Sequence, residues 1–197
     1  MHPAFSVIFF TVTSGAGYGL IALLGLFQFL HLGIFLDKNT FFISAGIAFS
    51  LFTMGLISST FHLANPKNAW RAFMRFRTSW LAREGLLAIL FYPFLFLYLY
   101  LNYINYQIDN FILMQTYSFT IFIFAVVIIY CTGMIYACLK TIPQWNTFWT
   151  PVNYISIGIF LGSLIFFFIL DFYNYEVEPY KFYLLLAIIF SFSMKLI

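Results

Sequence analysis

Residues 112–136 read ILMQTYSFTIFIFAVVIIYCTGMIY, a run of 25 residues without a charged side chain. A helix that crosses the hydrocarbon core of a bilayer needs about 20 mostly apolar residues. Strands of a transmembrane barrel would instead alternate apolar and polar residues over about ten positions. The stretch therefore predicts a transmembrane α-helix.

Five further apolar segments accompany this one, so we predict an all-α integral membrane protein, a polytopic bundle of about six transmembrane helices. The first segment lacks a basic region before it and is too long for a signal peptide, so we expect it to be retained. We expect the whole chain, 1–197, to form a single membrane domain. The six predicted spans are 6–36, 41–63, 83–102, 112–136, 152–172 and 179–195.

The composition excludes other classes of protein. Sixty-three per cent of the residues are apolar and 8% are charged, whereas soluble domains average roughly 45–50% and about 25%. Disorder needs low hydrophobicity and is excluded on the same ground. The net charge of +3 is small and dispersed, so we expect no nucleic-acid partner.

The basic residues gather at one end of the predicted bundle. Alternating spans bring together the N-terminus, the 64–82 and 137–151 loops and the C-terminus, and we call this end side A. Side A carries seven Lys and Arg residues and side B carries two. The positive-inside rule would place side A in the cytoplasm.

A short amphipathic helix is predicted at 65–77, because Asn65 and Pro66 form an N-cap and first-turn pair. Its basic residues share one face and its aromatic residues the other, as in a helix that lies in the membrane interface. The basic face is either a solvated loop surface or a docking surface for an acidic partner. The basic residues are Lys67, Arg71 and Arg75; Arg77 falls on the aromatic side, and we expect it to point inward.

His62 and Glu84 are ionisable residues at the side A ends of two spans. Ionisable groups at membrane depth are functional candidates by default, and histidine exchanges protons near neutral pH. The pair suits a site that binds a lipid-soluble quinol and removes its protons. The alternatives are that His62 snorkels to the interface and that Glu84 occupies a helix start where the macrodipole favours an anion, beside Arg83.

The chain is expected to hold no metal or redox cofactor of its own. His31 and His62 are separated by most of the bilayer, on the order of 25–30 Å, so they cannot share a haem, and His2 at the terminus is a poor ligand. Cys131 and Cys138 are too few for an iron–sulfur cluster, and we expect both in the core. Electrons taken from a quinol would therefore pass to a neighbouring subunit at side A.

Residues 14–19 read SGAGYG, within the first span. The small residues at positions 15 and 19 predict close packing between helices. The alternative is that they leave room for a quinone ring near side A.

Motifs along residues 1–155 resemble the membrane-anchor subunit of bacterial dimethyl sulfoxide reductase, the DmsC family. The block at 58–84 is the most specific of them. They include MHPAFSVIFFT at 1–11, SGAGY at 14–18, SSTFHL at 58–63, AWRAF at 69–73, SWL at 79–81 and TGMIYA at 132–137.

The resemblance implies a non-catalytic anchor subunit of an oxidoreductase complex. It would hold an iron–sulfur subunit and a molybdopterin catalytic subunit on the bacterial inner membrane, oxidise menaquinol during anaerobic respiration, and contain no haem. His62 then corresponds to the family's menaquinol-binding histidine and Glu84 to its acidic residue. Ser59, Arg71 and Arg77 would be possible lining, and Lys67, Arg71 and Arg75 would dock the partner.

Two expectations follow from differences with the family. Its members have eight helices, so we expect this chain to be a shortened copy. The family orientation places side A in the periplasm, against the charge rule, and we favour it because partner docking explains the basic loop. A purely structural anchor without quinol chemistry stays an alternative; a small-solute transporter is less supported, because no acidic ladder crosses the spans.

Overall fold

The computed structural model describes residues 5–30, 36–61, 70–71, 74–108, 111–173 and 178–195, with side chains left out at 105–108, 111, 178–183 and 194–195. Its main elements are helices, and no strand occurs within these ranges, which confirms the all-α prediction. The helices are α1 (Phe5–Leu30), α2 (Lys38–Thr60), α3 (Trp80–Ile108), α4 (Phe111–Ala137), α5 (Trp149–Phe172) and α6 (Glu178–Lys195).

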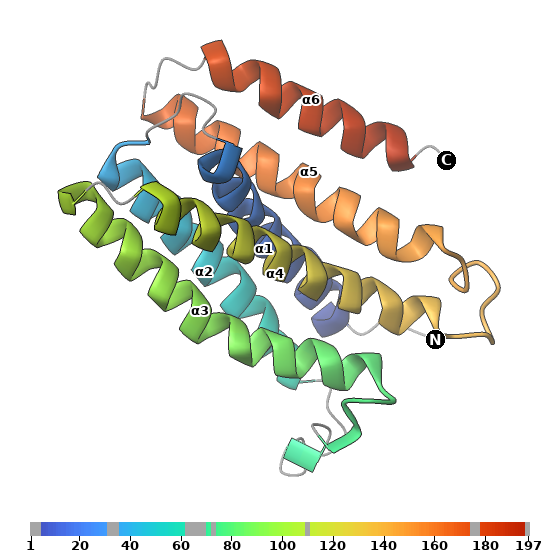
Figure 1. Cartoon of the computed structure of the whole chain (residues 1–197). Helices are drawn as coiled ribbons and strands as arrows, with labels where there is room; N and C mark the ends of the chain where they lie inside the picture. The colour runs from blue at the N-terminus through green and yellow to red at the C-terminus, as the bar shows by residue number, and fades with distance from the viewer. Residues whose placement is uncertain are drawn as a thin grey trace.

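Five of these helices are long and apolar enough to cross a membrane, by length and composition, within the described part of the chain: α1 to α5. The described apolar stretch of α6, Leu184–Ser193, is shorter than the roughly 20 residues of a span. The fold is thus a helical membrane bundle, as predicted. The starts of α1 and α3 and the junction of α4 with α5 lie at one end, side A (Figure 1).

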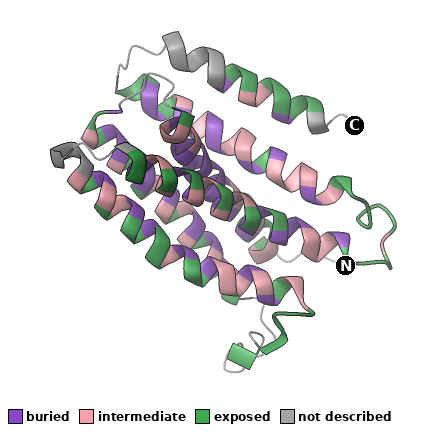
Figure 2. Ribbon diagram, viewed as in Figure 1, coloured by how far each residue is buried: buried purple, intermediate pink, exposed green. Residues whose placement is uncertain are grey.

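Helix α1 lies in the centre of the bundle and packs against α2, α4 and α5. Most residues of α1 between Ser14 and Phe27 are buried, whereas each outer helix has a buried face and an exposed face (Figure 2). Leu20, Ile21 and Leu24 are among the largest fully buried side chains. A helix that is apolar all round is suited to this central position.

Glycines let α1 approach its neighbours closely. A Cβ at Gly17 would lie 2.7 Å from the backbone oxygen of Ala48 on α2, and a Cβ at Gly19 would collide with the backbone of Gly158 on α5. The packing prediction is therefore confirmed at Gly19. At Gly15 a Cβ would meet nothing within 4 Å, but the Gly15 carbonyl oxygen would lie 3.1 Å from a Cβ at Gly158, so the backbones of α1 and α5 approach closely there too.

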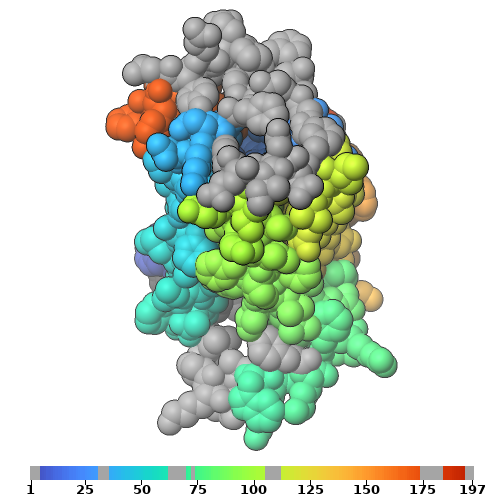
Figure 3. Space-filling model, turned by 60° about the vertical axis from the view of Figure 1, so that its left-hand side comes forward, coloured from blue at the N-terminus to red at the C-terminus, as the bar shows by residue number. Residues whose placement is uncertain are grey.

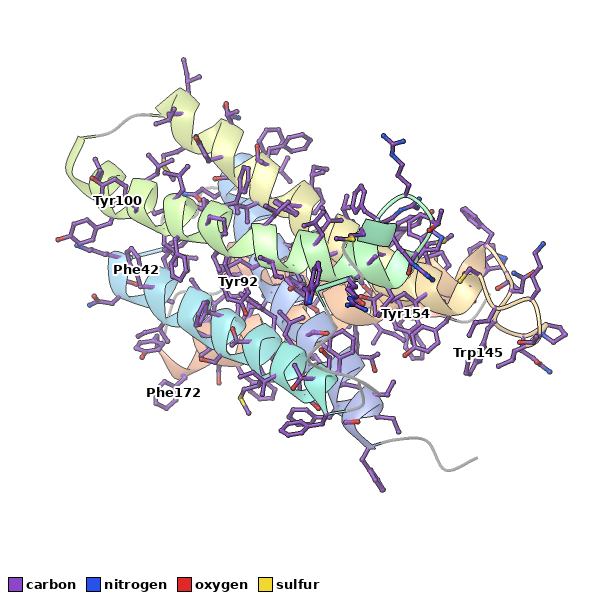
Figure 4. All side chains as sticks on the ribbon, turned by 90° about the horizontal axis from the view of Figure 1, so that it is seen from below. Phe42, Tyr92, Tyr100, Trp145, Tyr154 and Phe172 are labelled. Atoms are coloured by element: carbon purple, nitrogen blue, oxygen red, sulfur yellow. The ribbon has the colours of Figure 1, made fainter. Side chains whose placement is uncertain are left out.

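Aromatic rings fill the space between α2 and α3, whose backbones make few close contacts. Phe52 on α2 lies with its ring centroid 5.7 Å from that of Phe91 and 5.5 Å from that of Tyr92, both on α3. Figure 4 shows Tyr92 on the side of α3 that faces α2. Rings of this size hold the two backbones apart and bury a large apolar area.

The loop before α3 differs from the predicted amphipathic helix at 65–77. Asn65 and Pro66 lie outside the described residues, and the described part forms short 3₁₀ turns at 70–71 and 74–75. Residues of this loop project beyond the end of the bundle, with exposed side chains at Trp70 and Met74 (Figure 3). An α-helix this short needs tertiary packing for stability, and exposed side chains gain none.

Helix α3 begins three residues before the predicted span, at Trp80 rather than at residue 83. Ser79 acts as its N-cap: the Ser79 side-chain oxygen accepts a hydrogen bond from the amide of Ala82 at 3.4 Å. Serine is among the residues preferred at this position. The earlier start places Glu84 inside the helix instead of at its first turn.

Candidate functional site

Glu84 is buried inside the bundle, with 4% of its surface exposed. The hydroxyl of Thr132 on α4 donates a hydrogen bond to its Oε1 atom. A buried carboxyl is costly without a partner, and a hydroxyl provides a neutral one. Glu84 therefore stands at a polar contact between α3 and α4 on the side A half of the bundle.

Arg83, the neighbour of Glu84, points away from the carboxyl. Its guanidinium donates to the carbonyl of Phe76 at 3.0 Å and to that of Arg77 at 2.7 Å. It also lies 4.2 Å from the centroid of the Trp80 ring. Arg83 thus fastens the loop to the start of α3, and the alternative in which it accompanies Glu84 is not supported by this geometry.

A cavity of about 200 Å³ lies among α1, α4 and α5. Thr132 lines it, whereas Glu84 is not among the described residues that do. The apolar lining consists of Val12, Ile129, Ile157 and Leu161; the hydroxyl-bearing lining consists of Thr11, Ser14, Tyr18, Thr132 and Tyr154; Gly15 and Gly158 complete the wall. The open space predicted beside the glycine motif, near side A, therefore exists at Gly15.

The cavity reaches the outer surface of the bundle between α1 and α5. Val12 on α1 is 48% exposed and Ile157 on α5 is 40% exposed, and both line the cavity. Tyr154 lies in the part of the bundle near side A, toward the end where Trp145 lies (Figure 4). A lipid-soluble molecule can enter such a cavity sideways, from the apolar phase.

Three hydroxyls of the lining already donate their hydrogen to the protein. Thr11 donates to a backbone carbonyl of its own helix at 3.0 Å, and Ser14 does so at 2.6 Å. Thr132 donates to Glu84. Because a hydroxyl has one hydrogen and two lone pairs, these oxygens remain available as acceptors.

Tyr18 is the most buried aromatic residue of the lining, with 2% of its surface exposed. Its ring stacks on that of Phe52 with a centroid distance of 4.9 Å. Its hydroxyl is buried and has no hydrogen-bond partner among the described residues. Buried polar groups are nearly always paired, so this hydroxyl marks an incomplete polar arrangement beside the cavity.

None of the other predicted site residues that the structure describes lines the cavity. His62 and Lys67 fall outside the described residues, and so do His2 and His31. Ser59 is half-buried and donates to the carbonyl of Leu56 on its own helix at 2.7 Å.

The predicted arginines are all exposed: Arg71, Arg75 and Arg77. Arg71 lies with its guanidinium carbon 5.6 Å from the ring centroid of Trp70. The prediction that Arg77 points inward is wrong, because residues 76–78 form a turn outside the bundle. Arg71, Arg75 and Arg77 therefore form an exposed basic surface at side A.

Sequence reasoning missed the hydroxyls of the cavity, above all Thr132. Serine and threonine are common in membrane helices, where they bond to their own backbone, so no pattern separated Thr132 from Thr116 or Thr120.

The core prediction for the cysteines is confirmed at Cys131 and wrong at Cys138. Cys138 follows the end of α4 and is exposed for that reason.

The five apolar spans and the polar residues inside them define a multi-pass helical membrane protein. Residues 1–197 match the DMSO reductase anchor subunit (DmsC) family, and the chain belongs to this family. It is 31% identical over 179 residues to a subunit of the sulfite dehydrogenase of Allochromatium vinosum; the match covers 84% of this chain and 54% of that protein. The chain thus spans about half the length of that relative. No solved structure matches.

Proposed function

We propose that the chain is the membrane-anchor subunit of a dimethyl sulfoxide reductase-type molybdoenzyme complex in the bacterial inner membrane. It binds menaquinol at side A, removes its protons and passes its electrons to a partner iron–sulfur subunit. Membership in the anchor-subunit family supports the anchoring role. The cavity among α1, α4 and α5 supports the quinol chemistry.

The size of the cavity suits a quinol ring. An apolar cavity of about 150 Å³ binds benzene, and drug-sized ligands need roughly 300–1,000 Å³. At about 200 Å³ the cavity takes a ring system and leaves an isoprenoid chain outside. The chain of the quinol would leave between α1 and α5, past Val12 and Ile157, and remain in the apolar phase.

The main support for the proposal is that three hydroxyls of the cavity lining already donate their hydrogen to the protein, because such hydroxyls favour the reduced form of the ligand. A quinol presents O–H donors, and the oxygens of Thr11, Ser14 and Thr132 have lone pairs free to accept them. A quinone presents only carbonyl acceptors; the Tyr18 hydroxyl could donate to one of them, but Thr11, Ser14 and Thr132 would have to turn their hydrogens away from their present partners. This preference supports quinol as the form of the ligand that binds.

Protons and electrons then leave separately. Glu84 and His62 are the proposed proton acceptors, His62 by the family resemblance. We expect no redox centre in the chain itself, so the electrons pass to the iron–sulfur subunit and then to the molybdopterin catalytic subunit. The basic side chains of Lys67, Arg71 and Arg75 suit an acidic surface on the partner.

A second candidate function is the reverse reaction, in which the complex reduces a quinone. The Allochromatium vinosum relative is a subunit of a sulfite dehydrogenase, and a dehydrogenase takes electrons from its substrate. A membrane subunit of such a complex would deliver those electrons to a quinone. The acceptor-rich lining of the cavity favours the first candidate over this one.

The test uses membranes that contain the complete complex. A reduced naphthoquinone is added, and reduction of the iron–sulfur clusters is followed by their absorbance or electron paramagnetic resonance. We expect His62→Arg and Glu84→Gln to abolish this reduction while the complex still assembles. Asp171→Asn is the matched control, because this carboxyl is exposed at side B.

Full quinol oxidation by both variants would contradict the proposal and favour a purely structural anchor. A wild-type complex that reduces quinone but fails to oxidise quinol would favour the second candidate. Reverting Glu84→Gln to the wild-type residue should restore the rate.

A further inference from the structure

We infer that the hydroxyl of Thr132 carries a proton from the cavity to Glu84. This inference rests on the proposed function and adds a proton-transfer step to it. It assigns a role to a residue on α4 that is 48 positions from Glu84 in the sequence.

Glu84 needs an intermediary, because it is not among the described residues that line the cavity. It is buried with 4% of its surface exposed, on a different helix from those that form the cavity wall. A carboxyl must lie within hydrogen-bond reach of the proton that it takes, or be linked to it through one bridging group. Thr132 is the described lining residue whose hydroxyl bonds to this carboxyl.

Thr132 has the geometry of a bridging group. Its hydroxyl oxygen lies 3.2 Å from the carbonyl of Ile128, one turn earlier, and bonds to the Glu84 carboxyl as well. Its single hydrogen therefore faces two acceptors, and the Ile128 carbonyl holds the side chain in place. The lone pairs of the same oxygen can accept a hydrogen bond from a ligand in the cavity.

The step balances when each transfer is counted. One quinol O–H bond breaks and its proton binds the Thr132 oxygen, while the hydrogen of Thr132 binds the Glu84 carboxylate, so threonine is unchanged. One electron leaves to an iron–sulfur cluster of the partner subunit. The second proton, taken by His62 in the proposed function, and a second electron complete the oxidation to quinone.

Two other threonines of α4 show that the contact with Glu84 is specific. Thr116 and Thr120 donate to the carbonyls of Ile112 and Thr116, at 3.0 and 2.8 Å, and neither lines the cavity. A bond of this kind is the ordinary state of a threonine in a helix. Thr132 makes a similar backbone contact and adds the carboxyl.

The experiment uses the complete complex in membranes and three variants. Thr132→Val removes the hydroxyl at nearly constant shape, Thr132→Ser restores it, and Thr120→Val is the matched control on the same helix. Binding is measured with 2-heptyl-4-hydroxyquinoline N-oxide by fluorescence quenching. The rate of cluster reduction by a reduced naphthoquinone is measured in a single turnover.

We expect Thr132→Val to slow cluster reduction by about 10²-fold, the lower end of the range for general acid–base catalysis. The affinity for the N-oxide should change less than about threefold. Thr132→Ser should recover most of the rate, and Thr120→Val should match the wild type. The double variant of Thr132→Val with Glu84→Gln should behave as Glu84→Gln alone, because the two residues act as one unit.

A wild-type rate in Thr132→Val would overturn the inference. Equal rates in Thr132→Ser and Thr132→Val would also overturn it, because they would indicate a packing role. A loss of N-oxide affinity as large as the loss of rate would overturn it too, because it would indicate a role in binding. If Thr132→Val fails to assemble, Thr132→Ala supplies the hydroxyl-free variant. A wild-type rate in Glu84→Gln refutes the role of Glu84 in the proposed function. If Glu84→Gln is slow while Thr132→Val keeps the wild-type rate, only the proton transfer through Thr132 is refuted.

Discussion

The hydroxyl of Thr132 donates a hydrogen bond to the carboxyl of Glu84, and this contact joins α4 to α3 inside the bundle. Thr132 also lines the cavity among α1, α4 and α5. The contact thus connects a buried carboxyl with a space that opens toward the lipid. Substitutions in the wall of that space, and in the packing that encloses it, should have distinct effects.

Filling the cavity should block ligand binding without disturbing the fold. A Cβ at Gly15 would meet nothing within 4 Å, so Gly15→Leu places its side chain into the cavity. We expect the affinity for 2-heptyl-4-hydroxyquinoline N-oxide to fall at least about tenfold, because one ring-sized space is lost. Gly46→Leu is the matched control, since a Cβ at Gly46 also meets open space but on the outside of α2. Equal affinities in both variants would contradict the location of the site.

A methyl group at Gly17 should destabilise the bundle. Its Cβ would lie 2.7 Å from Ala48 O and from Phe52 N, which are backbone atoms that cannot rotate away. We expect Gly17→Ala to lower the free energy of unfolding by about 1–3 kcal/mol, as overpacking does. Unfolding of the purified protein in mixed micelles measures this. Gly15→Ala is the control and should leave stability within about 0.5 kcal/mol.

Two buried tyrosines should respond differently to loss of the hydroxyl. Tyr18 has an unpartnered hydroxyl among the described residues, whereas that of Tyr98 donates to Gln28 Oε1 at 2.5 Å. We expect Tyr18→Phe to keep or slightly raise the free energy of unfolding and Tyr98→Phe to lower it by about 1 kcal/mol. The two variants are compared by the same unfolding measurement. A larger loss in Tyr18→Phe than in Tyr98→Phe would show that the Tyr18 hydroxyl has a partner.

The polar cluster around Gln28, in the side B half of the bundle, should hold α1, α3 and α4 together. Gln28 on α1 accepts hydrogen bonds from Tyr98 and from Ser118, at 2.5 and 2.8 Å, and donates to Asn102 Oδ1 at 2.6 Å. Bonds between membrane helices average about 0.6 kcal/mol and reach about 1.7 kcal/mol. We therefore expect Gln28→Leu to cost about 2 kcal/mol of stability, summed over these bonds.

Gln115 offers a comparison for the cluster around Gln28, because it donates a single hydrogen bond to the carbonyl of Phe29 at 3.2 Å. Gln115→Leu should cost less than Gln28→Leu in the same unfolding assay. The ligand affinity of both variants should equal that of the wild type, since neither residue lines the cavity. An equal stability loss in the two variants would argue against a shared network.

The order of the helices was predictable from the sequence, and so was the position of Glu84 near side A. Hydropathy placed the spans, and the ionisable Glu84 at a span end indicated side A. The start of α3 was missed by three residues, because the N-cap signal of Ser79 lies within a polar loop that also carries several cations. Arg77 was expected inside and is exposed, because helical periodicity was applied to a segment that forms turns.

The sequence by itself determined that this chain is a helical membrane bundle, because the transfer of a segment into lipid depends mainly on the summed apolarity of its own residues. Only the tertiary structure decided that Thr132 reaches Glu84 and that Gly15, unlike Gly19, borders open space. Those facts depend on how each helix is rotated about its axis and how closely its neighbours approach. Rotation and approach follow from the joint packing of many side chains, and no single segment encodes them.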